Sequence, residues 1–491
     1  MAEQLIPHVI ESLIGTGPLL IMIFGAMAVL VADVLLPRDR RPLLSVISLV
    51  VVALAFWDLH MVGSPGGSGS ESYYFGALRA NSLVFLAQNV ILGGAFFLIL
   101  IAPRYLDGKR IPLGEFYALL LIAVTAMLAL AASTELLTLF LNIELLSITL
   151  YVLVGIENRN SHATEAAFKY FLLGSVAAAF LLFGIAFVFG ATGQTRYDRI
   201  AEVIAAGGIV QPAFLAIGLG LMLVGFGFKL SLAPFHMYAP DVYEGAPTPI
   251  AAAVATGSKV AALGALFHLI ELASGWSDAP AGLWAALYAI TLISMIVGNV
   301  GAIIQPNFLR MMAYSSISHS AYAVVPMVVL LRRPDLLIDA RDAVGYYMLA
   351  YTIMTLLAFG VATILGRQGE GRIASYAGLG RRAPLLAALM ALAMLSLLGI
   401  PPAVGFFGKL RLFAVAVEGG HYWLAVIGVL SSVASAYYYL RVIVTMYMQE
   451  PAEGAEPAIP TLDRVNAVAL SVCSACLFVF AIFQGVYLFG S

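Results

Sequence analysis

The stretch LMLVGFGFKLSLAPFHMYAPD, residues 221–241, is apolar enough to lie in a membrane, yet it carries a lysine and two prolines. Pro234 has no amide hydrogen to donate to the carbonyl of Leu230, and its ring clashes with that turn of a helix. Pro240 then ends the helix. Unpaired backbone at membrane depth is tolerated only where it is buried in protein or lines a hydrated cavity. The stretch therefore predicts a broken membrane helix beside a buried charge, Lys229.

A second stretch, LLGIPPAVGFFGKLRLF at 397–413, has the same character, with Pro401–Pro402 just before Lys409. The segments FGFKL (226–230) and FFGKL (406–410) occupy comparable places five apolar segments apart, which suggests an internal repeat of about five helices. An odd repeat length makes successive copies point in opposite directions across the membrane. Inverted repeats with broken helices recur in secondary transporters, although they also occur in bundles that transport nothing.

The remainder of the chain is equally apolar. A mean hydropathy of +0.98, with 62% hydrophobic and 11% charged residues, excludes a soluble globular protein. A membrane span needs about 20 apolar residues. Fourteen segments meet this requirement: 17–36, 43–63, 80–103, 115–133, 135–157, 165–191, 212–238, 247–273, 281–304, 307–331, 343–366, 384–416, 422–449 and 462–488. The longest polar stretches, at 63–76, 192–211 and 450–460, are predicted to be loops.

We therefore expect an all-α polytopic membrane protein of about 14 transmembrane helices. It would contain two inverted five-helix repeats, each with a proline-broken helix. The expected parts are residues 1–114 with helices 1–3, 115–273 as the first repeat with helices 4–8, 281–449 as the second repeat with helices 9–13, and 450–491 as a loop with helix 14.

The distribution of positive charge predicts the orientation. The connections after spans 1, 3, 5, 9 and 11 hold twice as many Arg and Lys residues as the opposite connections. This places those connections in the cytoplasm and both termini outside. The start, MAEQLIPHVIESLIG, lacks a basic region and an Ala-x-Ala cleavage site, so no cleaved signal peptide is expected. A net charge of −2 gives no polybasic surface for nucleic acid.

Lysine is rare, and its placement is selective. Only five residues are lysine, and all but Lys109 lie inside or at the edge of apolar segments, whereas most arginines lie in the polar gaps. A charge at the bilayer centre costs roughly 3 kcal/mol on insertion scales. Arginine keeps its proton at any physiological pH, but a buried lysine can lose its own. These lysines therefore suggest a path for protons.

Glu144 and Lys229 are expected to form the first part of this path. Glu144 lies in the middle of the span 135–157, too far from either end to reach the membrane surface, with Ser147 one turn away. Lys229, beside the break at Pro234, is its natural partner. The alternative is a purely structural ion pair. Glu135 on the same span is a second candidate for the carboxylate.

Lys259 and His319 are the next candidates. Lys259 follows Thr256 and Ser258 in the span 247–273, and hydroxyl groups can hold the water that a proton path needs. His319 lies in AYSSISHSAYAV, where the serines indicate either a hydrated relay or polar contacts between helices. His236 and His268 are weaker candidates of the same kind.

Lys409 and Lys169 have different surroundings. Lys409 follows the Pro401–Pro402 break and is far from any loop. Lys169 lies only one turn into the span 165–191, four residues after Glu165, so that it could instead extend to the membrane surface. Asp33 and Arg441 are expected to be charges at the membrane interface.

Signs of a redox or metal centre are missing from the sequence. There is no G-x-G-x-x-G after a strand and no phosphate-binding loop, and Cys473 and Cys476 form a lone CxxC pair inside an apolar run. Gly218, Gly220, Gly225 and Gly227 would instead allow close packing of helices. No cofactor is expected in this chain.

Several stretches of the sequence, which contain the candidate residues, resemble the antiporter-like membrane subunits of respiratory complex I, the proton-translocating NADH:quinone oxidoreductase. GFKLSLAPFHMYAPDVYEGAPTPIAAAVATGSK (227–259) is most similar to the subunit N family. The resemblance extends to LNIELLSITLYVL (141–153), EAAFKYFLLGS (165–175), NFLRMMAYSSISHSAY (307–322) and GIPPAVGFFGKL (399–410). The related M subunits usually carry glutamate where Lys409 stands, and L subunits continue into a long lateral helix, so both comparisons favour N.

The resemblance implies a role for each candidate. Glu144 and Lys229 would be the ion pair that gates proton uptake, and Lys169 would tune that pair. Lys259 would be the central relay group, followed by His319, and Lys409 would release the proton outward.

The resemblance also implies the surroundings. Protons would pass from the cytoplasm to the periplasm across the bacterial inner membrane, driven by quinone reduction in other subunits that hold FMN and iron–sulfur clusters. The M and K type subunits and the lipid bilayer would be the partners. An Mrp-type Na⁺/H⁺ antiporter subunit and a non-transporting scaffold subunit are the alternatives.

Overall fold

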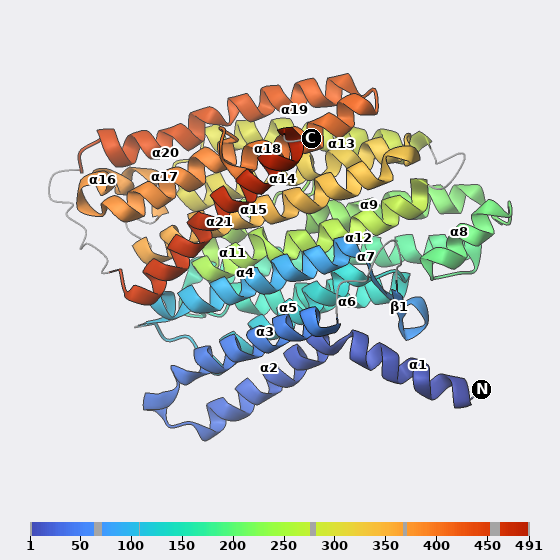
Figure 1. Ribbon diagram of the computed structural model, residues 1–491, viewed down its shortest axis with the longest axis horizontal. Coiled ribbons are helices and arrows are strands. Elements are labelled where there is room, and N and C mark those ends of the chain that lie inside the picture. The colour runs from blue at the N-terminus through green and yellow to red at the C-terminus, as the bar shows by residue number, and fades with distance from the viewer. Residues whose placement is uncertain are drawn as a thin grey trace.

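The protein is a bundle of long apolar helices that lie side by side (Figure 1). The computed structural model describes residues 2–62, 71–107, 109–274, 281–366, 371–451 and 462–489. Up to the first broken helix, the elements are α1 (Ala2–Gly15), α2 (Gly17–Leu35), α3 (Leu43–Val62), β1 (Glu71–Tyr73), β2 (Leu78–Ala80), α4 (Ser82–Leu106), α5 (Leu113–Ala132), α6 (Leu136–Val154), α7 (Ser161–Thr192), α8 (Tyr197–Ala205) and α9 (Pro212–Lys229).

The second part of the chain continues the bundle. Its helices are α10 (Ala239–Gly245), α11 (Thr248–Ala255), α12 (Gly257–Ser274), α13 (Ala281–Ile303), α14 (Phe308–Leu330), α15 (Leu337–Leu365), α16 (Leu379–Arg382), α17 (Pro384–Leu398), α18 (Val404–Glu418), α19 (Tyr422–Ala434), α20 (Ala436–Met448) and α21 (Arg464–Phe489). Short 3-10 turns occur at Arg38–Arg40, Tyr74–Gly76, Pro334–Leu336 and Ile373–Tyr376.

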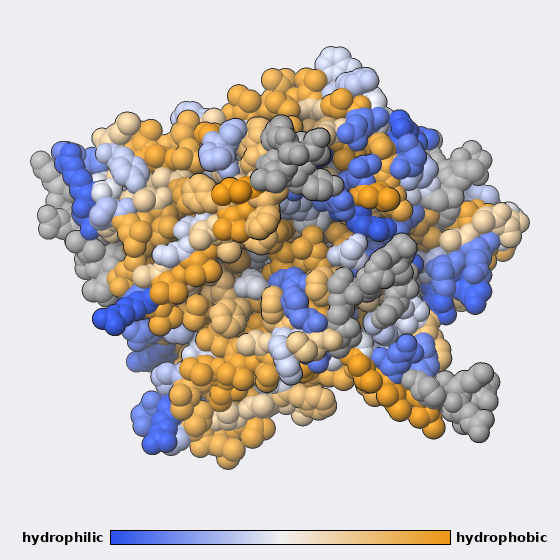
Figure 2. Space-filling view, viewed as in Figure 1, coloured by the Kyte–Doolittle hydropathy of each residue, from blue (hydrophilic) through white to orange (hydrophobic). Residues whose placement is uncertain are grey.

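The expected membrane architecture is confirmed. Within the described residues, thirteen helical segments are long and apolar enough to cross a membrane. The fourteenth expected span, 384–416, is divided into α17 and α18 around Pro401–Pro402 and is therefore too short in either half to be counted with them. Apolar side chains cover most of the face shown in Figure 2, and most hydrophilic ones gather toward its left and right sides, where the helices end. The protein is a multi-pass membrane protein.

Both predicted proline breaks are present. Span 7 is divided into α9 and α10, which are separated by residues 230–238, and span 12 into α17 and α18. One detail of the sequence interpretation is wrong, because the two lysine motifs lie on opposite sides of their breaks. Lys229 is the last residue of α9, before the break, whereas Lys409 lies in α18, after it. FGFKL and FFGKL are therefore not structurally comparable positions.

Two further breaks were not predicted. Span 8 is interrupted at Thr256, between α11 and α12, and span 13 at Ser435, between α19 and α20. Neither interruption contains a proline. Spans 7 and 8 are thus broken in succession, and so are spans 12 and 13, five spans later. This spacing agrees with a repeat of five helices, while the boundaries assigned to the two repeats stay predictions.

The connections contain more structure than expected. The polar stretch 192–211 was predicted to be a loop, but it holds the helix α8. Strands β1 and β2 form an antiparallel hairpin, so part of the stretch 63–76 is also ordered; residues 63–70 and the loop 452–461 lie outside the described residues. The amphipathic helix α1 was missed as well, and it projects from the bundle at the lower right of Figure 1.

Candidate functional site

Three lysine side chains lie inside the bundle, next to the helix breaks. Lys229, Lys259 and Lys409 are only 3%, 1% and 6% exposed. The side chain of Lys169, in contrast, is 43% exposed. This confirms that the first three lysines are buried and that Lys169 belongs to a different environment.

Lys229 ends α9, and its amino group points to α6. Its Nζ donates a hydrogen bond of 3.0 Å to Ser147 Oγ, which itself donates to the carbonyl of Ile143. Glu144, one turn before Ser147, has a buried Oε1 with no hydrogen-bond partner among the described residues. Glu144, Ser147 and Lys229 line one cavity of about 10 Å³, which is close to the space that a single water needs.

The expected Glu144–Lys229 ion pair is therefore not direct here. Within the described residues, no ion pair within 4.0 Å joins the two side chains, and Ser147 accepts the hydrogen bond instead. Both charges nevertheless face the same small cavity. A single water, or a change of side-chain rotamer, would be enough to connect them. Glu135 has a separate role: its carboxylate caps the start of α6 by accepting from Thr138 N at 2.6 Å.

Lys259, near the start of α12, is held by neutral oxygen atoms from two other helices. Its Nζ lies 3.2 Å from the Leu230 carbonyl, 3.0 Å from the Ser316 carbonyl, 2.5 Å from Ser316 Oγ and 2.9 Å from Ser320 Oγ. Leu230 lies at the end of α9, and both serines lie on α14. No carboxylate within the described part of the chain forms an ion pair with this amine.

His319 follows Lys259 in space. A cavity of about 10 Å³ is lined by both residues, together with Ser320, Tyr347 and Tyr351. Each ring nitrogen of His319 meets a tyrosine hydroxyl: Nδ1 lies 2.8 Å from Tyr347 Oη, and Nε2 lies 3.1 Å from Tyr439 Oη. A neutral imidazole donates from one nitrogen and accepts at the other. The two hydroxyls therefore allow either tautomer.

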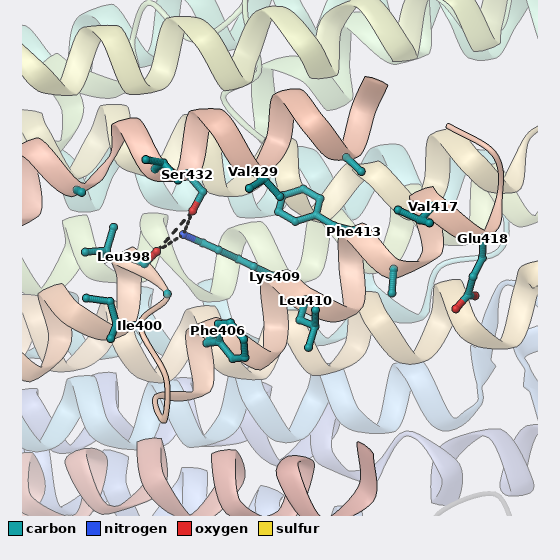
Figure 3. A pocket seen from close by; sticks show the side chains of 15 residues that line it. Leu398, Ile400, Phe406, Lys409, Leu410, Phe413, Val417, Glu418, Val429 and Ser432 are labelled. Carbon is teal, nitrogen blue, oxygen red and sulfur yellow. Dashed lines mark hydrogen bonds between the residues drawn. The ribbon is translucent and has the colours of Figure 1, made fainter. Parts of the chain in front are cut away.

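Lys409 on α18 turns back to the carbonyl groups at the end of α17. Its Nζ donates to the carbonyls of Leu397 and Leu398, both at 2.9 Å, and to Ser432 Oγ at 2.7 Å. Figure 3 shows the amino group directed at Ser432 and at the Leu398 carbonyl, with Glu418 far from it. The lysine lies in the wall of a mainly apolar cavity of about 640 Å³ between α18 and α19.

Polar side chains fill much of the space between His319 and Lys409. Tyr322 on α14 has its hydroxyl 3.0 Å from Ser431 Oγ and accepts from Asn299 Nδ2 at 3.0 Å. Ser431 precedes Ser432, the partner of Lys409, and the Nζ of Lys409 lies 5.5 Å from the centre of the Tyr322 ring. Lys259, His319 and Lys409 thus belong to one nearly continuous polar layer inside apolar helices.

Lys169 belongs to a surface group of charges at α10. Its Nζ lies 2.7 Å from Glu165 Oε1 and 2.7 Å from Asp241 Oδ2. Arg310 on α14 contacts Asp241 at 2.6 Å and Glu244 at 2.8 Å. Asp241 thus has cationic partners on two helices, Lys169 on α7 and Arg310 on α14.

Several residues of the layer were missed from the sequence. Tyr347, Tyr439, Tyr322, Asn299 and Ser432 carried no signal, because single tyrosines and serines are common in membrane helices. Asp241, Glu244 and Arg310 are visible as charges near the ends of spans, but nothing in their spacing shows that they meet. Among the described residues, no group of three or more His, Cys, Asp or Glu side chains could hold a metal ion.

The fold and the site define a class of protein. It is a polytopic membrane protein with discontinuous helices, and buried lysines bonded to neutral oxygen atoms lie beside the breaks of these helices. The sequence profile of the family described as "NADH:quinone oxidoreductase/Mrp antiporter, TM" matches residues 133–435. The chain therefore belongs to this family, within the branch of NADH-quinone oxidoreductase subunit N.

Two relatives show the extent of this likeness. NADH-quinone oxidoreductase subunit N of Chloroflexus aggregans is 41% identical over 471 residues, which cover 93% of this chain and 92% of the relative. The protein of the same name from Trichlorobacter lovleyi is 39% identical over 457 residues, covering 91% and 88%.

Solved structures agree with the fold. A chain of respiratory complex I from Thermus thermophilus with bound aureothin aligns with a TM-score of 0.79 and 32% identity, covering 96% of this chain and 98% of that one. A chain of an archaeal membrane-bound sulfane sulfur reductase aligns with a TM-score of 0.81 at 22% identity, and this likeness concerns the fold alone.

Proposed function

We propose that the protein is the subunit N of an NADH:quinone oxidoreductase and that it translocates protons from the cytoplasm to the periplasm. Glu144 and Lys229 receive the proton, Lys259 holds it at the centre of the bundle, His319 passes it on and Lys409 releases it. Lys169 tunes this path through its ion pair with Asp241 on α10.

The observation that carries this proposal is the environment of the three buried amines. Their partners are carbonyl and hydroxyl oxygens, and among the described residues none forms an ion pair with a carboxylate. A permanent charge without a counter-ion is costly inside a membrane protein. An amine can avoid that cost by giving up a proton, whereas a guanidinium cannot. Lysines in such sites suit a reversible proton load better than a fixed structural charge.

The proposed surroundings rest on the resemblance to subunit N and on the distribution of positive charge among the connections. The proposed partners are the M and K type subunits of the same complex and the lipid of a bacterial inner membrane, with both termini in the periplasm. The energy would come from quinone reduction in other subunits, which would hold the FMN and the iron–sulfur clusters. No cofactor is assigned to this chain.

A cation/proton antiporter subunit is the second candidate, because the description of the family also covers Mrp antiporters. The names and the high coverage of the relatives favour the oxidoreductase. A scaffold subunit, whose buried charges only specify helix packing, is the third.

The test is Lys229→Ala in membrane vesicles that contain the fully assembled complex. We expect NADH-driven proton pumping to fall strongly, while Lys109→Ala, which removes a surface ion pair with Glu157, leaves it unchanged. If pumping and quinone reduction both survive in the assembled Lys229→Ala complex, the proposal is wrong. Sodium-dependent proton exchange without any NADH-driven pumping would instead support the antiporter.

A further inference from the structure

The short helix α10 has one side directed at the proposed proton path and another that carries the surface charges. Asp241 and Glu244 lie on α10, and both carboxylates contact Arg310 of α14. Asp241 also binds Lys169 of α7, and Glu244 Oε1 accepts from Asn307 Nδ2 at 3.0 Å. Two long helices therefore hold this half-helix by its charged side.

Tyr243 lies on the same short helix but is fully buried. Successive residues of a helix are rotated by about 100°, so Tyr243 points away from the face that carries Asp241. Its hydroxyl lies 2.9 Å from Ser316 Oγ. Ser316 Oγ lies in turn 2.5 Å from Lys259 Nζ. A chain of two hydrogen bonds thus joins α10 to the central lysine.

Which group donates in each of these two hydrogen bonds depends on whether Lys259 is protonated. An ammonium group can only donate, so Ser316 must then accept from Lys259 and direct its own hydrogen elsewhere, toward Tyr243. A neutral amine has a lone pair, so Ser316 can donate to Lys259 and accept from Tyr243. Either hydroxyl can act as the donor in the pair that the two residues form. Tyr243 can therefore satisfy Ser316 in both states.

We propose that Tyr243 is a positioning residue for Lys259: its hydroxyl holds Ser316 in place and reverses its hydrogen bond when Lys259 gains or loses a proton. This inference rests on the proposed proton path and adds a residue of α10 to it. The α10 charges have a part in this arrangement because they fix the helix on which Tyr243 lies.

The first test is Tyr243→Phe in the assembled complex, which removes the hydroxyl and keeps the ring. A single hydrogen bond contributes about 0.5–1.5 kcal/mol, so we expect NADH-driven proton pumping to fall roughly two- to tenfold. Tyr197→Phe is the matched control, because Tyr197 is also a buried tyrosine and its hydroxyl has no hydrogen-bond partner among the described residues. Pumping by this control should stay unchanged.

A double-mutant cycle with Ser316→Ala separates a positioning role from simple packing. If Tyr243 acts through Ser316, the double variant Tyr243→Phe/Ser316→Ala pumps no more slowly than Ser316→Ala alone. Multiplied effects of the two substitutions, or unchanged pumping in Tyr243→Phe, would overturn the inference. Should Tyr243→Phe fail to assemble, Ser316→Ala decides alone, because wild-type pumping by this variant would contradict the coupling.

Lys259→Ala in the same vesicles distinguishes a failure of the proposed proton path from a failure of the role assigned to Tyr243. If Lys259→Ala pumps like the wild type, the proposed proton path is itself wrong. If Lys259→Ala abolishes pumping while Tyr243→Phe pumps normally, the path stands and only the role of Tyr243 is excluded.

Discussion

The amino group of Lys259 lies 3.2 Å from the carbonyl oxygen of Leu230. In an unbroken helix, the amide at position 234 would bond to this carbonyl, but Pro234 has no amide hydrogen. A lysine from the following span thus satisfies a backbone group that a proline leaves unpaired. Lys409 does the same at the other break by donating to the Leu397 and Leu398 carbonyls. In both cases the cation lies at the negative end of a half-helix, where positive charge is favoured.

The proposed function requires Lys259 to gain and lose a proton at this position, which leads to the first prediction. Lys259→Arg keeps a positive charge near the Leu230 carbonyl but cannot release a proton. We expect Lys259→Arg to abolish NADH-driven pumping as completely as Lys259→Ala does. Vesicles with equal amounts of assembled complex provide the measurement. Substantial pumping by Lys259→Arg would mean that only the charge matters.

The second prediction concerns the hydroxyl that binds Lys409. Ser432→Ala removes one of three hydrogen bonds to its amino group and leaves the two carbonyl partners. A hydrogen bond to a charged group contributes about 1.5–3 kcal/mol, so the balance between the charged and neutral forms of Lys409 should shift, and pumping should slow by at least several-fold. Ser474→Ala is the control, since that hydroxyl bonds to the Ser471 carbonyl within α21. Equal rates in the two variants would contradict a role for Ser432.

The third prediction separates the two interpretations of His319. His319→Phe would leave the buried hydroxyl of Tyr347 unpaired, at a cost of about 1–3 kcal/mol, whereas the hydroxyl of Tyr439 would keep its partner Ser315 Oγ. His319→Gln keeps a donor and an acceptor but cannot pass a proton. We expect both variants to lose pumping, and only His319→Phe to lower the unfolding temperature of the complex clearly. Normal pumping by His319→Gln would show that His319 only holds the helices together.

Much of this architecture could be predicted from the sequence. Spans and proline breaks follow directly from hydropathy and from the missing amides of Pro234 and Pro402, because local chemistry decides them. The break at Thr256 could not be predicted, since no proline marks it. The helix α8 was missed although its nine residues are strongly amphipathic, because the connection was interpreted from its overall polar composition.

The site was predicted to a similar degree. Rare charges in apolar spans identified Lys229, Lys259 and Lys409, since the cost of burying a charge makes each of them informative. The partners of these lysines depend on side-chain directions that spacing does not fix. Ser147 and Glu144 lie one turn apart on α6, and only the structure shows that Lys229 bonds to the serine. Nothing in the sequence places Tyr243 of α10 beside Ser316 of α14.

The last prediction tests the contact between α7 and α9, on which the position of Lys229 depends. A Cβ atom at Gly218 would lie 2.8 Å from the Gly184 carbonyl oxygen and 2.9 Å from the Val188 amide nitrogen. Both are backbone atoms of α7, so the clash can be relieved only by moving the helix. Gly218→Ala should therefore push the helices apart, at a cost of about 1–3 kcal/mol for overpacking. We expect a lower unfolding temperature and slower pumping.

Gly220→Ala is the matched control for this packing argument. A Cβ atom at Gly220 meets no other atom within 4 Å, and alanine is favoured over glycine in a helix by about 1 kcal/mol. The unfolding temperature of this variant should be unchanged or slightly higher. The sequence analysis assigned close packing to both glycines, so equal destabilisation by the two substitutions would contradict a packing contact that is specific to Gly218. A loss confined to Gly218→Ala would instead tie the position of Lys229 to the approach of the two helices at Gly184.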